Sequence, residues 1–322
     1  MSMSLAPPTP IAAEPGAVVI TGICGRLGRR LARKLHRQRR VIGIDRRSFP
    51  DRPADVEHHE LDLRSPRVRE VFSAGVSALV HLGVVHDPRG DTAEHHASNV
   101  TGLQKLLEYV EYFGLQKVVL LSSANVYGPR PDNPQFLSEE APLLGAGPFS
   151  RIRDLVELDM CAQSFFWRLQ EVKTVILRPA HILGTVRNAP SNYLRLSVVP
   201  TLLGFDPMLQ AVHQDDVVRA ILLALAPSAR GIYNIAGPPA VPLSRVLELL
   251  ERPTVAVPHT VARLGVERLF RWRVTSFPAP ELDFIRYVCM IDDARARQEL
   301  GYAPAHGLVS TLCAVDEERW LG

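Results

Sequence analysis

Three glycines near the start of the chain have a spacing that suits a phosphate-binding turn. The apolar run Val18–Ile20 is followed by Gly22, Gly25 and Gly28, and then by a helical pattern. Gly22 lets the chain turn sharply, Gly25 leaves room for a pyrophosphate to approach the backbone, and Gly28 lets the helix pack close to the strand. The N–H groups at the helix start favour an anion. An ordinary βα turn is the alternative, but the preceding strand and following helix favour a dinucleotide site.

A second apolar run, over residues 41–44, ends in an acid. Asp45 lies 17 residues beyond Gly28, about where a carboxylate meets the ribose hydroxyls of an adenosine. This carboxylate favours NAD as the cofactor, because it would repel the 2′-phosphate of NADP. Arg46 and Arg47 follow at once and are able to hold that phosphate instead, so NADP stays open as the alternative.

The elements that must position these residues alternate between strand and helix patterns. After Asp45, strands are expected over 56–63, 78–82, 117–123 and 173–177, and helices over 67–72, 91–113 and from residue 149 onward. Apolar strands alternating with helices predict an α/β fold with a Rossmann-type, doubly wound parallel sheet.

The second half of the chain is less regular and richer in proline. Short strands are expected over 209–213 and 231–235, helices over 215–226 and 243–251, and no assignment is made for 255–305. We therefore expect a disordered tail over 1–15, a dinucleotide-binding domain over 16–184 and a smaller C-terminal substrate-binding portion over 185–322. The strands at 209–213 and 231–235 are expected to return to the first domain.

Composition narrows the class of partner. The chain has 322 residues, 46% of them hydrophobic, and a net charge of +3. Residues 26–47 hold ten Lys/Arg against one acid, which we interpret as a solvated helix face beside a phosphate site rather than a nucleic-acid surface. The four cysteines and eleven histidines lack metal-ligand spacing, so no metal is expected. The cysteines also lack disulfide spacing, so a cytoplasmic location is expected. Neither a secretory signal nor a membrane-spanning run is apparent.

Several further motifs, taken together, carry a resemblance to a known family. The chain resembles the extended short-chain dehydrogenase/reductases, the NAD-dependent nucleotide-sugar epimerase/dehydratase group, from about residue 16 to 305. The motifs are the glycine turn, Asp45, Asp62-Leu63, His81-Leu82-Gly83, Asn99, the run 122–128 (SSANVYG), the run 178–184 (RPAHILG), the run 212–217 (VHQDDV) and the late Leu300-Gly301-Tyr302.

The resemblance implies a bound nicotinamide dinucleotide with substrate held between two domains. It places the cofactor-binding positions at Gly22, Cys24, Gly25, Arg26, Leu27, Asp45, Arg46, Asp62, Leu63, Leu82, Gly83, Asn99, Ser122, Arg153 and Pro179.

The catalytic groups of that family are a tyrosine, a lysine four residues later on the same helix face, and a serine or threonine after the fifth strand. Ser123 matches the serine. The tyrosine position falls on Phe149 and the lysine position on Arg153, while Glu157 fits the acid usual on that helix. Phe149 has no proton to give, and Arg153 keeps a positive charge for ribose binding without being a proton carrier near neutral pH.

Two histidines are candidates for the missing proton transfer. His181 follows the sixth strand at a position that often faces substrate in the family, and histidine has a suitable pKa for acid–base work. A hydrogen-bonded structural histidine is the more frequent explanation for such a residue. His86, after the fourth strand, is a weaker candidate on the same grounds.

The resemblance also bears on substrate and assembly. A basic stretch with an interleaved tryptophan suits a substrate diphosphate or a solvated helix face; it comprises Arg263, Arg268, Arg271, Trp272, Arg273 and Arg286. By analogy with the family, a homodimer is expected.

Three functional hypotheses follow. The first is an NAD(P)-dependent oxidoreductase or epimerase with non-standard proton transfer, acting on a nucleotide sugar or another carbonyl or alcohol substrate. The second is a catalytically degenerate NAD(P)-binding protein. The third is a non-redox enzyme on the same fold.

Overall fold

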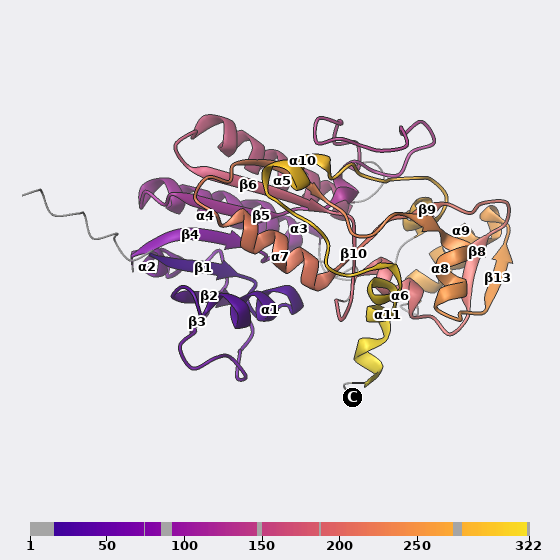
Figure 1. The fold of residues 1–322 in the computed structure, drawn as a ribbon, viewed down its shortest axis with the longest axis horizontal. Coiled ribbons are helices and arrows are strands. Elements are labelled where there is room, and N and C mark those ends of the chain that lie inside the picture. The colour runs from indigo at the N-terminus through magenta and orange to yellow at the C-terminus, as the bar shows by residue number, and fades with distance from the viewer. Residues whose placement is uncertain are drawn as a thin grey trace, which may run out of the picture.

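A computed structural model describes residues 16–73, 75–84, 92–146, 150–186, 188–272 and 279–320. The expected tail over 1–15 lies outside these residues, as do Phe149, His86 and Arg273. Strands and helices alternate through the first half of the chain, which forms the larger, layered part of the molecule, and shorter elements from the second half gather at one end of it (Figure 1).

A seven-stranded parallel sheet forms the centre of the fold. Its order is β11-β6-β5-β4-β1-β2-β3, so the strand order reverses beside β1. This is the Rossmann-type α/β sheet that the sequence predicted, with the ligand crevice expected at the carboxyl ends of the strands where the order reverses. The strands are β1 (Ala17–Thr21), β2 (Val41–Asp45), β3 (Glu57–Glu60), β4 (Val76–His81), β5 (Lys117–Leu121), β6 (Lys173–Pro179) and β11 (Gly231–Ile235).

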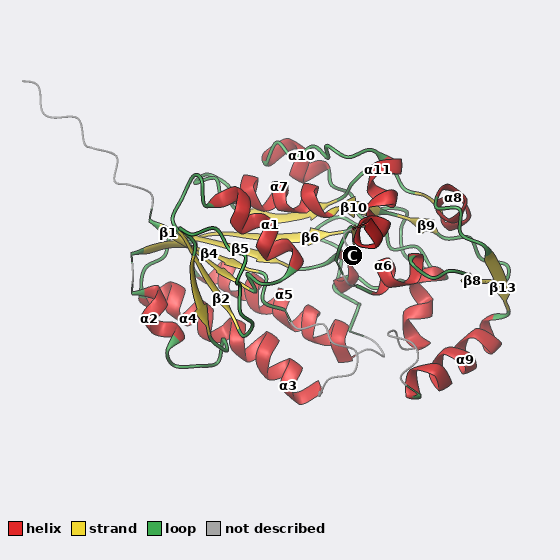
Figure 2. Ribbon diagram, turned by 90° about the horizontal axis from the view of Figure 1, so that it is seen from below, coloured by secondary structure: helices red, strands yellow, loops and turns green. Residues whose placement is uncertain are grey.

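The apolar runs form strands because both faces of the sheet are covered. Every residue of β1 and of β2 is buried. Val18 and Ile20 belong to the hydrophobic cluster on one face, which includes residues of α1 (Arg26–Leu35) and α7 (Gln214–Ala224). Val19 belongs to the cluster on the other face, which includes residues of α2 (Val68–Phe72), α4 (Gly102–Tyr112) and α5 (Ser150–Arg168). Figure 2 shows the helices on either side of the sheet.

The helix expected over 91–113 is interrupted. It consists of α3 (Thr92–His96), a π-helical turn at Ala97–Thr101 and then α4. A π-helical turn widens the helix locally, a feature that often marks functional sites. Here it contains the buried side chain of Asn99.

The shorter elements of the second half pair in three two-stranded sheets. β7 (His181–Leu183) pairs with β10 (Ala211–His213), β9 (Met208–Leu209) with β12 (Val241–Pro242), and β8 (Val199–Leu202) with β13 (Thr254–Val257). The remaining helices are α6 (Ala189–Leu194), α8 (Leu243–Leu249), α9 (His259–Arg271), α10 (Ala294–Glu299) and α11 (Leu308–Cys313), with 3-10 turns at Ala279–Ile285 and Ala314–Trp320.

Of the two strands expected to return to the first domain, one joins the main sheet. Residues 231–235 form β11, which pairs with β6. The segment 209–213 is not one strand but two, on different partners, and neither is in the main sheet. The break falls at Gln210, whose side-chain amide donates to the Ile291 carbonyl and accepts from the Ile291 N–H, each at 2.9 Å. This exchange with a distant segment separates the two strands.

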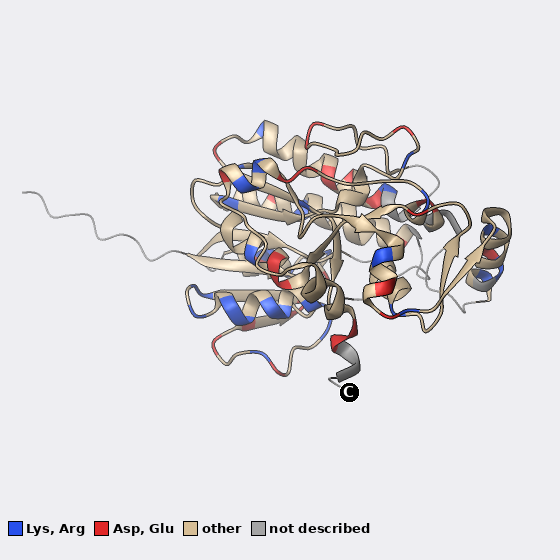
Figure 3. Ribbon diagram, turned by 45° about the vertical axis from the view of Figure 1, so that its right-hand side comes forward, with Lys and Arg blue, Asp and Glu red and all other residues tan. Residues whose placement is uncertain are grey.

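The basic run over 26–47 is largely ion-paired. Arg29 and Arg33 of α1 both pair with Asp51, at 2.7 and 2.6 Å, and Arg30 pairs with Asp215 at 3.0 Å. Figure 3 shows basic residues along α1 with acidic ones close by. Within the described ranges, none of the helices has the length and apolar character that a bilayer span requires.

Candidate functional site

The glycine turn connects β1 to α1 with little room for side chains. Gly22 has a φ of +71°, and a Cβ there would lie 2.7 Å from the Cα of Gly83. A Cβ on Gly28 would lie 2.5 Å from the Gly22 carbonyl oxygen. Gly25 begins α1 without any side-chain cap, and the first turn of the helix contains no acid. Its backbone N–H groups are therefore suited to an anion, such as a pyrophosphate.

Asp45 lies at the end of β2, next to this turn. Its carboxylate accepts a hydrogen bond from the Cys24 N–H at 3.1 Å. Arg47 donates to both carboxylate oxygens through Nε and Nη2, at 3.0 and 3.1 Å. Burial acts to raise the pKa of Asp45, but the hydrogen bonds from Arg47 and Cys24 hold it below its usual range. Asp45 is therefore charged at neutral pH and is already engaged by Arg47.

Asp62, after β3, has the same relationship with an arginine. Arg64 donates through Nε and Nη2 to the two carboxylate oxygens, at 2.9 and 2.8 Å. Hydrogen bonding to Arg64 lowers the pKa of Asp62 to about 2, although partial burial opposes the shift. Arg46 lies 3.9 Å from the same carboxylate. The expected adenosine end of the site is thus surrounded by arginines.

Cys24 and its neighbours cover the rest of the turn. The Cys24 thiol donates to the Arg47 carbonyl at 3.1 Å. Burial, with the nearby Asp45 charge, raises the pKa of this thiol to about 11, so it is protonated and poorly nucleophilic. Arg26 and Leu27 form the first turn of α1, as expected for residues beside the anion.

The middle of the expected cofactor path consists of apolar and small residues. A Cβ on Gly83 would lie 3.2 Å from the Leu63 side chain and 3.2 Å from Thr21 Oγ1, so backbone is brought close to backbone here. Leu82 donates its N–H to the Thr21 carbonyl at 3.1 Å. Asn99 is buried in the π-helical turn. These residues lie at the carboxyl ends of β1, β3 and β4 or in the helix that follows them.

The two serines after β5 have different partners. Ser122 is buried and donates to Asp159 Oδ2 at 2.6 Å. Ser123 accepts a hydrogen bond from the Asn125 N–H at 3.2 Å, which leaves its own hydroxyl proton able to be donated elsewhere. The catalytic role of Ser123 stays a prediction, whereas Ser122 is held inside the fold.

Two acids of α5 are buried, Asp154 and Asp159, and it is Asp159, two residues beyond the expected Glu157, that pairs with a residue of the main sheet. Arg178 forms a bidentate pair with Asp159, at 2.9 and 2.6 Å, and both side chains are almost wholly inaccessible to solvent. Glu157 has a side chain that is 40% exposed and lies 3.4 Å from His96. The face of α5 toward the strand ends therefore contains Asp159 and, one turn earlier, the buried Leu155.

Arg153 lies one turn before Glu157 and is exposed. Its role in ribose binding stays a prediction. A residue that binds the ribose would face the strand ends, whereas Arg153 lies on the exposed side of α5. Phe149 lies outside the described residues.

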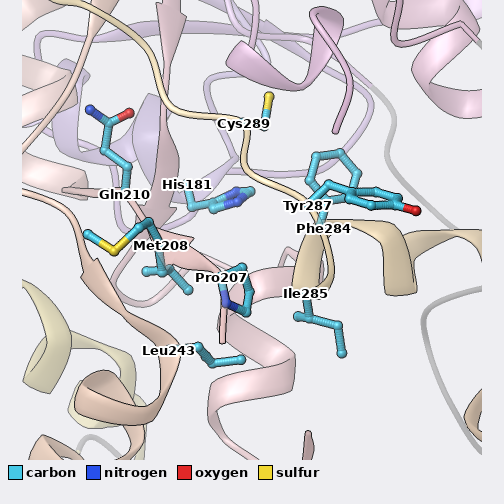
Figure 4. Close-up of a pocket in the computed structure, with 10 residues that line it drawn as sticks. His181, Pro207, Met208, Gln210, Leu243, Phe284, Ile285, Tyr287 and Cys289 are labelled. Carbon is cyan, nitrogen blue, oxygen red and sulfur yellow. The ribbon is translucent and has the colours of Figure 1, made fainter. Parts of the chain in front are cut away.

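A pocket at the carboxyl ends of β5 and β6 contains His181 (Figure 4). Pro179 is the last residue of β6. The His181 ring packs edge-to-face on the Phe284 ring, with the ring centroids 5.9 Å apart. Burial lowers the pKa of His181 to about 4, so it is neutral at pH 7. The sequence suggested that His181 has a pKa suited to acid–base work. Its apolar surroundings explain why this pKa is lower than that of an ordinary histidine. The pocket is lined by His181, Pro207, Met208, Leu209, Gln210, Leu243, Phe284, Ile285, Tyr287 and Cys289.

The pocket adjoins the serine side of the site and a basic residue. The Cys289 thiol lies 3.8 Å from the carbonyl oxygen of Ala124, the residue after Ser123. Arg286 lies over the rings of Phe205 and Tyr287, at 5.1 and 4.8 Å from their centroids. The Nε of Arg286 is buried and has no hydrogen-bond partner among the described residues. Of the basic stretch noted in the sequence, Arg286 is therefore adjacent to the pocket.

From the sequence, Arg47 was considered as a ligand of a 2′-phosphate and not as the partner of Asp45, and Arg64 was not singled out. The repeated pattern Asp-x-Arg, at 45–47 and again at 62–64, was the available signal. Asp159 was missed because Glu157 matched the expected spacing.

Comparison with known proteins agrees with this geometry. Residues 18–236 match the model of the NAD dependent epimerase/dehydratase family. An uncharacterized protein of Mycobacterium tuberculosis is 29% identical over 308 residues, which cover 90% of this chain and 80% of that protein. A UDP-glucose 4-epimerase of Dictyostelium discoideum is 26% identical over 172 residues, which cover 50% of this chain and 49% of the epimerase.

Solved structures show the same fold. The structure of MoeE5 with UDP-glucuronic acid and NAD superposes with a TM-score of 0.74 at 22% identity, covering 95% of this chain and 100% of MoeE5. The UDP-glucuronic acid 4-epimerase of Bacillus cereus with NAD gives a TM-score of 0.73 at 16% identity, covering 95% and 99% of the two chains. Because the family model spans more than half of the sequence, this chain belongs to the NAD dependent epimerase/dehydratase family.

Proposed function

We propose that this protein binds NAD in the glycine turn between β1 and α1. The observation that carries the proposal is the conjunction of Gly22, the uncapped start of α1 and Asp45 at the end of the adjacent strand. The turn accommodates a pyrophosphate, and the carboxylate is placed for ribose hydroxyls once Arg47 moves aside. The NAD-bound structures with the same fold support this assignment.

The reaction we propose is an oxidoreduction or epimerisation at a carbon bearing a hydroxyl or carbonyl group. Bound nicotinamide supplies hydride acceptance and donation. Ser123 donates its hydroxyl proton to the reacting oxygen, and the aromatic pocket beside it holds the remainder of the substrate. A nucleotide sugar is the substrate class that the related epimerases and MoeE5 support, with Arg286 placed for its diphosphate. Another carbonyl or alcohol compound is the alternative, because the pocket lining is mostly apolar.

Proton transfer must depart from the tyrosine–lysine pair of the family. In the register suggested by sequence, Phe149 and Arg153 replace that pair. The burial of Leu155 and the contacts of Asp159 support a register displaced by two residues, in which Arg151 and Leu155 take those positions. Both registers lack the tyrosine and the lysine. With a pKa near 4, His181 is a weak base and a poor proton donor at neutral pH, so it serves as a neutral hydrogen-bonding group.

The two registers make different predictions for restored activity. The double variant Arg151→Tyr/Leu155→Lys is expected to raise hydride transfer, whereas Phe149→Tyr/Arg153→Lys is expected not to. Rates would be followed by nicotinamide absorbance with UDP-glucose and UDP-glucuronic acid as substrates. A higher rate in Phe149→Tyr/Arg153→Lys alone would show that the register predicted from the sequence is the correct one.

A second candidate function is NAD binding without turnover. The burial of Leu155 one turn before Asp159 favours it, because an apolar side chain there can neither hold a ribose nor carry a proton. The same purified protein separates the two candidates. Calorimetric titration with NAD, NADH, NADP and NADPH measures binding, and hydride transfer to or from nucleotide sugars measures turnover. Binding without transfer supports the second candidate, and binding of none of the four would reject both.

We further propose that the protein is a cytoplasmic homodimer. Large apolar side chains are exposed on adjacent helices, Tyr112 of α4 at 68% and Met160 and Trp167 of α5 at 54% and 65%. Such a surface suits a partner of the same kind. Sedimentation of the wild type and of Trp167→Glu tests the dimer, with a shift to monomer expected in the variant. None of the four cysteines is in a disulfide, which suits a reducing compartment.

A further inference from the structure

A histidine and two carboxylates meet where α3 packs against α5. His96 is the last residue of α3, and Asp154 and Glu157 lie one turn apart in the first half of α5. Their spacing of three residues places both carboxylates on one face of α5. Because α3 packs against that helix, the imidazole of His96 faces them both.

The three groups converge on one point. His96 Nδ1 lies 3.1 Å from Asp154 Oδ1 and 3.4 Å from Glu157 Oε2. One ligand atom from each residue lies within 4.8 Å of the other two. Two atoms that bind the same zinc ion at about 2.1 Å are separated by about 3.0–3.4 Å, depending on the bond angle. The observed separations from Nδ1 lie in this range or at its limit, and the 3.1 Å contact with Asp154 is also a hydrogen bond, which an ion would replace.

The charge of the cluster also calls for a cation. The Asp154 side chain is only 5% exposed, and a buried carboxylate requires a compensating partner. Among the side chains that the structure describes, which do not include that of Arg151 on the same helix, the ion-pair partner of Asp154 and Glu157 is His96, which offers both of them the same nitrogen. A single imidazole proton leaves negative charge in excess, which a divalent ion would neutralise.

We propose that His96, Asp154 and Glu157 bind a divalent transition-metal ion. One imidazole and two carboxylates form a mixed nitrogen–oxygen set that suits Zn²⁺, Co²⁺ or Mn²⁺ better than Mg²⁺ or Ca²⁺, which prefer oxygen alone. His96 and Glu157 are 46% and 40% exposed, so water completes the coordination. His96 binds through Nδ1 and keeps its proton on Nε2. The sequence separation of 58 between His96 and Asp154 explains why no ligand spacing was visible in the sequence.

A second cluster, formed by His213, Asp215 and His306, fits a metal less well. The two imidazole rings are stacked at 3.7 Å with an interplanar angle of 18°, so their lone pairs run nearly parallel and do not meet at one ion. His213 Nδ1 accepts the Asp215 N–H at 3.1 Å, and Arg30 pairs with Asp215 at 3.0 Å. The lone pair of His213 Nδ1 and the carboxylate of Asp215 therefore already have partners.

The test is calorimetric titration of the purified full chain with Zn²⁺ and, separately, Co²⁺, whose visible absorption reports its ligands. The wild type is expected to bind one ion per chain. His96→Ala and Glu157→Gln alter partly exposed side chains and should leave the fold intact. Each is expected to weaken binding by at least about tenfold, since even disturbing a ligand's outer partner costs about 10–100-fold. Mg²⁺ at the same concentration is expected to give no binding heat.

Two variants provide controls. His36 pairs with a single carboxylate, that of Asp55, at 3.0 Å, so His36→Ala removes a comparable histidine from outside the cluster and should leave binding unchanged. His306→Ala should also leave it unchanged. Equal binding by the wild type, His96→Ala and Glu157→Gln would overturn the proposal. So would loss of binding in His306→Ala alone, which would assign the ion to the second cluster.

Discussion

Arg178 of β6 and Asp159 of α5 form an ion pair in the interior, with Nη2 and Oδ1 2.6 Å apart and both side chains at most 1% exposed. Ser122 donates to the same carboxylate, and Arg178 donates to the Tyr127 hydroxyl at 2.9 Å. Tyr127 in turn donates to Asn234 Oδ1 of β11 at 2.8 Å. The pair therefore connects two strands, β6 and β11, and the segment after β5 with the helix α5.

Breaking this pair should strongly destabilise the protein. Asp159→Asn leaves the Arg178 charge buried without its counterion, and removal of one partner of such a pair costs about 3–5 kcal/mol. Urea unfolding followed by circular dichroism measures the change in the free energy of unfolding. As a control, Asp132→Asn breaks the exposed pair with Arg130, 3.0 Å long, and should cost far less, because solvent screens such a pair. Similar losses in both variants would contradict the burial argument.

Alanine at Gly22 should abolish NAD binding. The substitution combines a positive φ with a Cβ 2.7 Å from the Gly83 backbone, so the turn has to change shape. Gly114→Ala is a matched control, because Gly114 has a φ of +66° but nothing within 4 Å of its Cβ position. That variant should lose about 1–2 kcal/mol of stability and bind NAD as the wild type does. Calorimetry on both folded variants measures the difference, and normal binding by Gly22→Ala would remove the turn from the site.

Arg47 should control the choice between NAD and NADP. It occupies both oxygens of Asp45, which the ribose hydroxyls must share, so Arg47→Ala is expected to strengthen NAD binding severalfold and to weaken NADP binding. Asp45→Asn should weaken NAD binding. The wild type should prefer NAD to NADP. Titration of the three proteins with both cofactors tests the pattern, and stronger NADP binding by the wild type would show that the arginines determine the pocket.

Acid should destabilise the protein partly through Asp62. Arg64 lowers the pKa of this carboxyl from 3.8 to about 2 in the folded protein. A depressed pKa stabilises the fold fully above the unfolded value, and this contribution is lost as the pH falls through the folded value. The loss should therefore occur between about pH 4 and pH 2. Asp62→Asn should flatten the curve of stability against pH in that window. Above about pH 5, which is about one unit above the window, the slope of the curve should stay unchanged. An identical acid limb in both proteins would contradict the role of Asp62.

The fold of the first half was predictable because its strands are buried on both faces. A continuous apolar run such as residues 41–44 is typical of a strand in a parallel sheet that is covered on both faces, and the glycine turn fixes where the first strand ends. The second half was less predictable. Strands such as Met208–Leu209 contain two residues and pair with distant segments, so no local periodicity reveals them.

The candidate site, like the fold, has one part that was predictable from the sequence and one that was not. Asp45 and Ser123 were predicted because they end or follow a strand, and the strand ends position them directly, while their roles stay predictions. Residues on α5 were harder to place, since a shift of two residues in a helix moves a side chain by about 200° around the axis. Glu157 and Asp159 are both acids, and only packing against Arg178 and Ser122 shows which one is buried.

The order of the main sheet has a consequence for synthesis on the ribosome. β6 receives its outer neighbour, β11, only after β7, β8, β9 and β10 have been made. Until then β6 presents an open edge of backbone donors and acceptors, and unpaired edges of this kind promote aggregation of partly made chains. The nascent protein therefore has a period of vulnerability that the finished molecule lacks, during which a holding chaperone would be most useful.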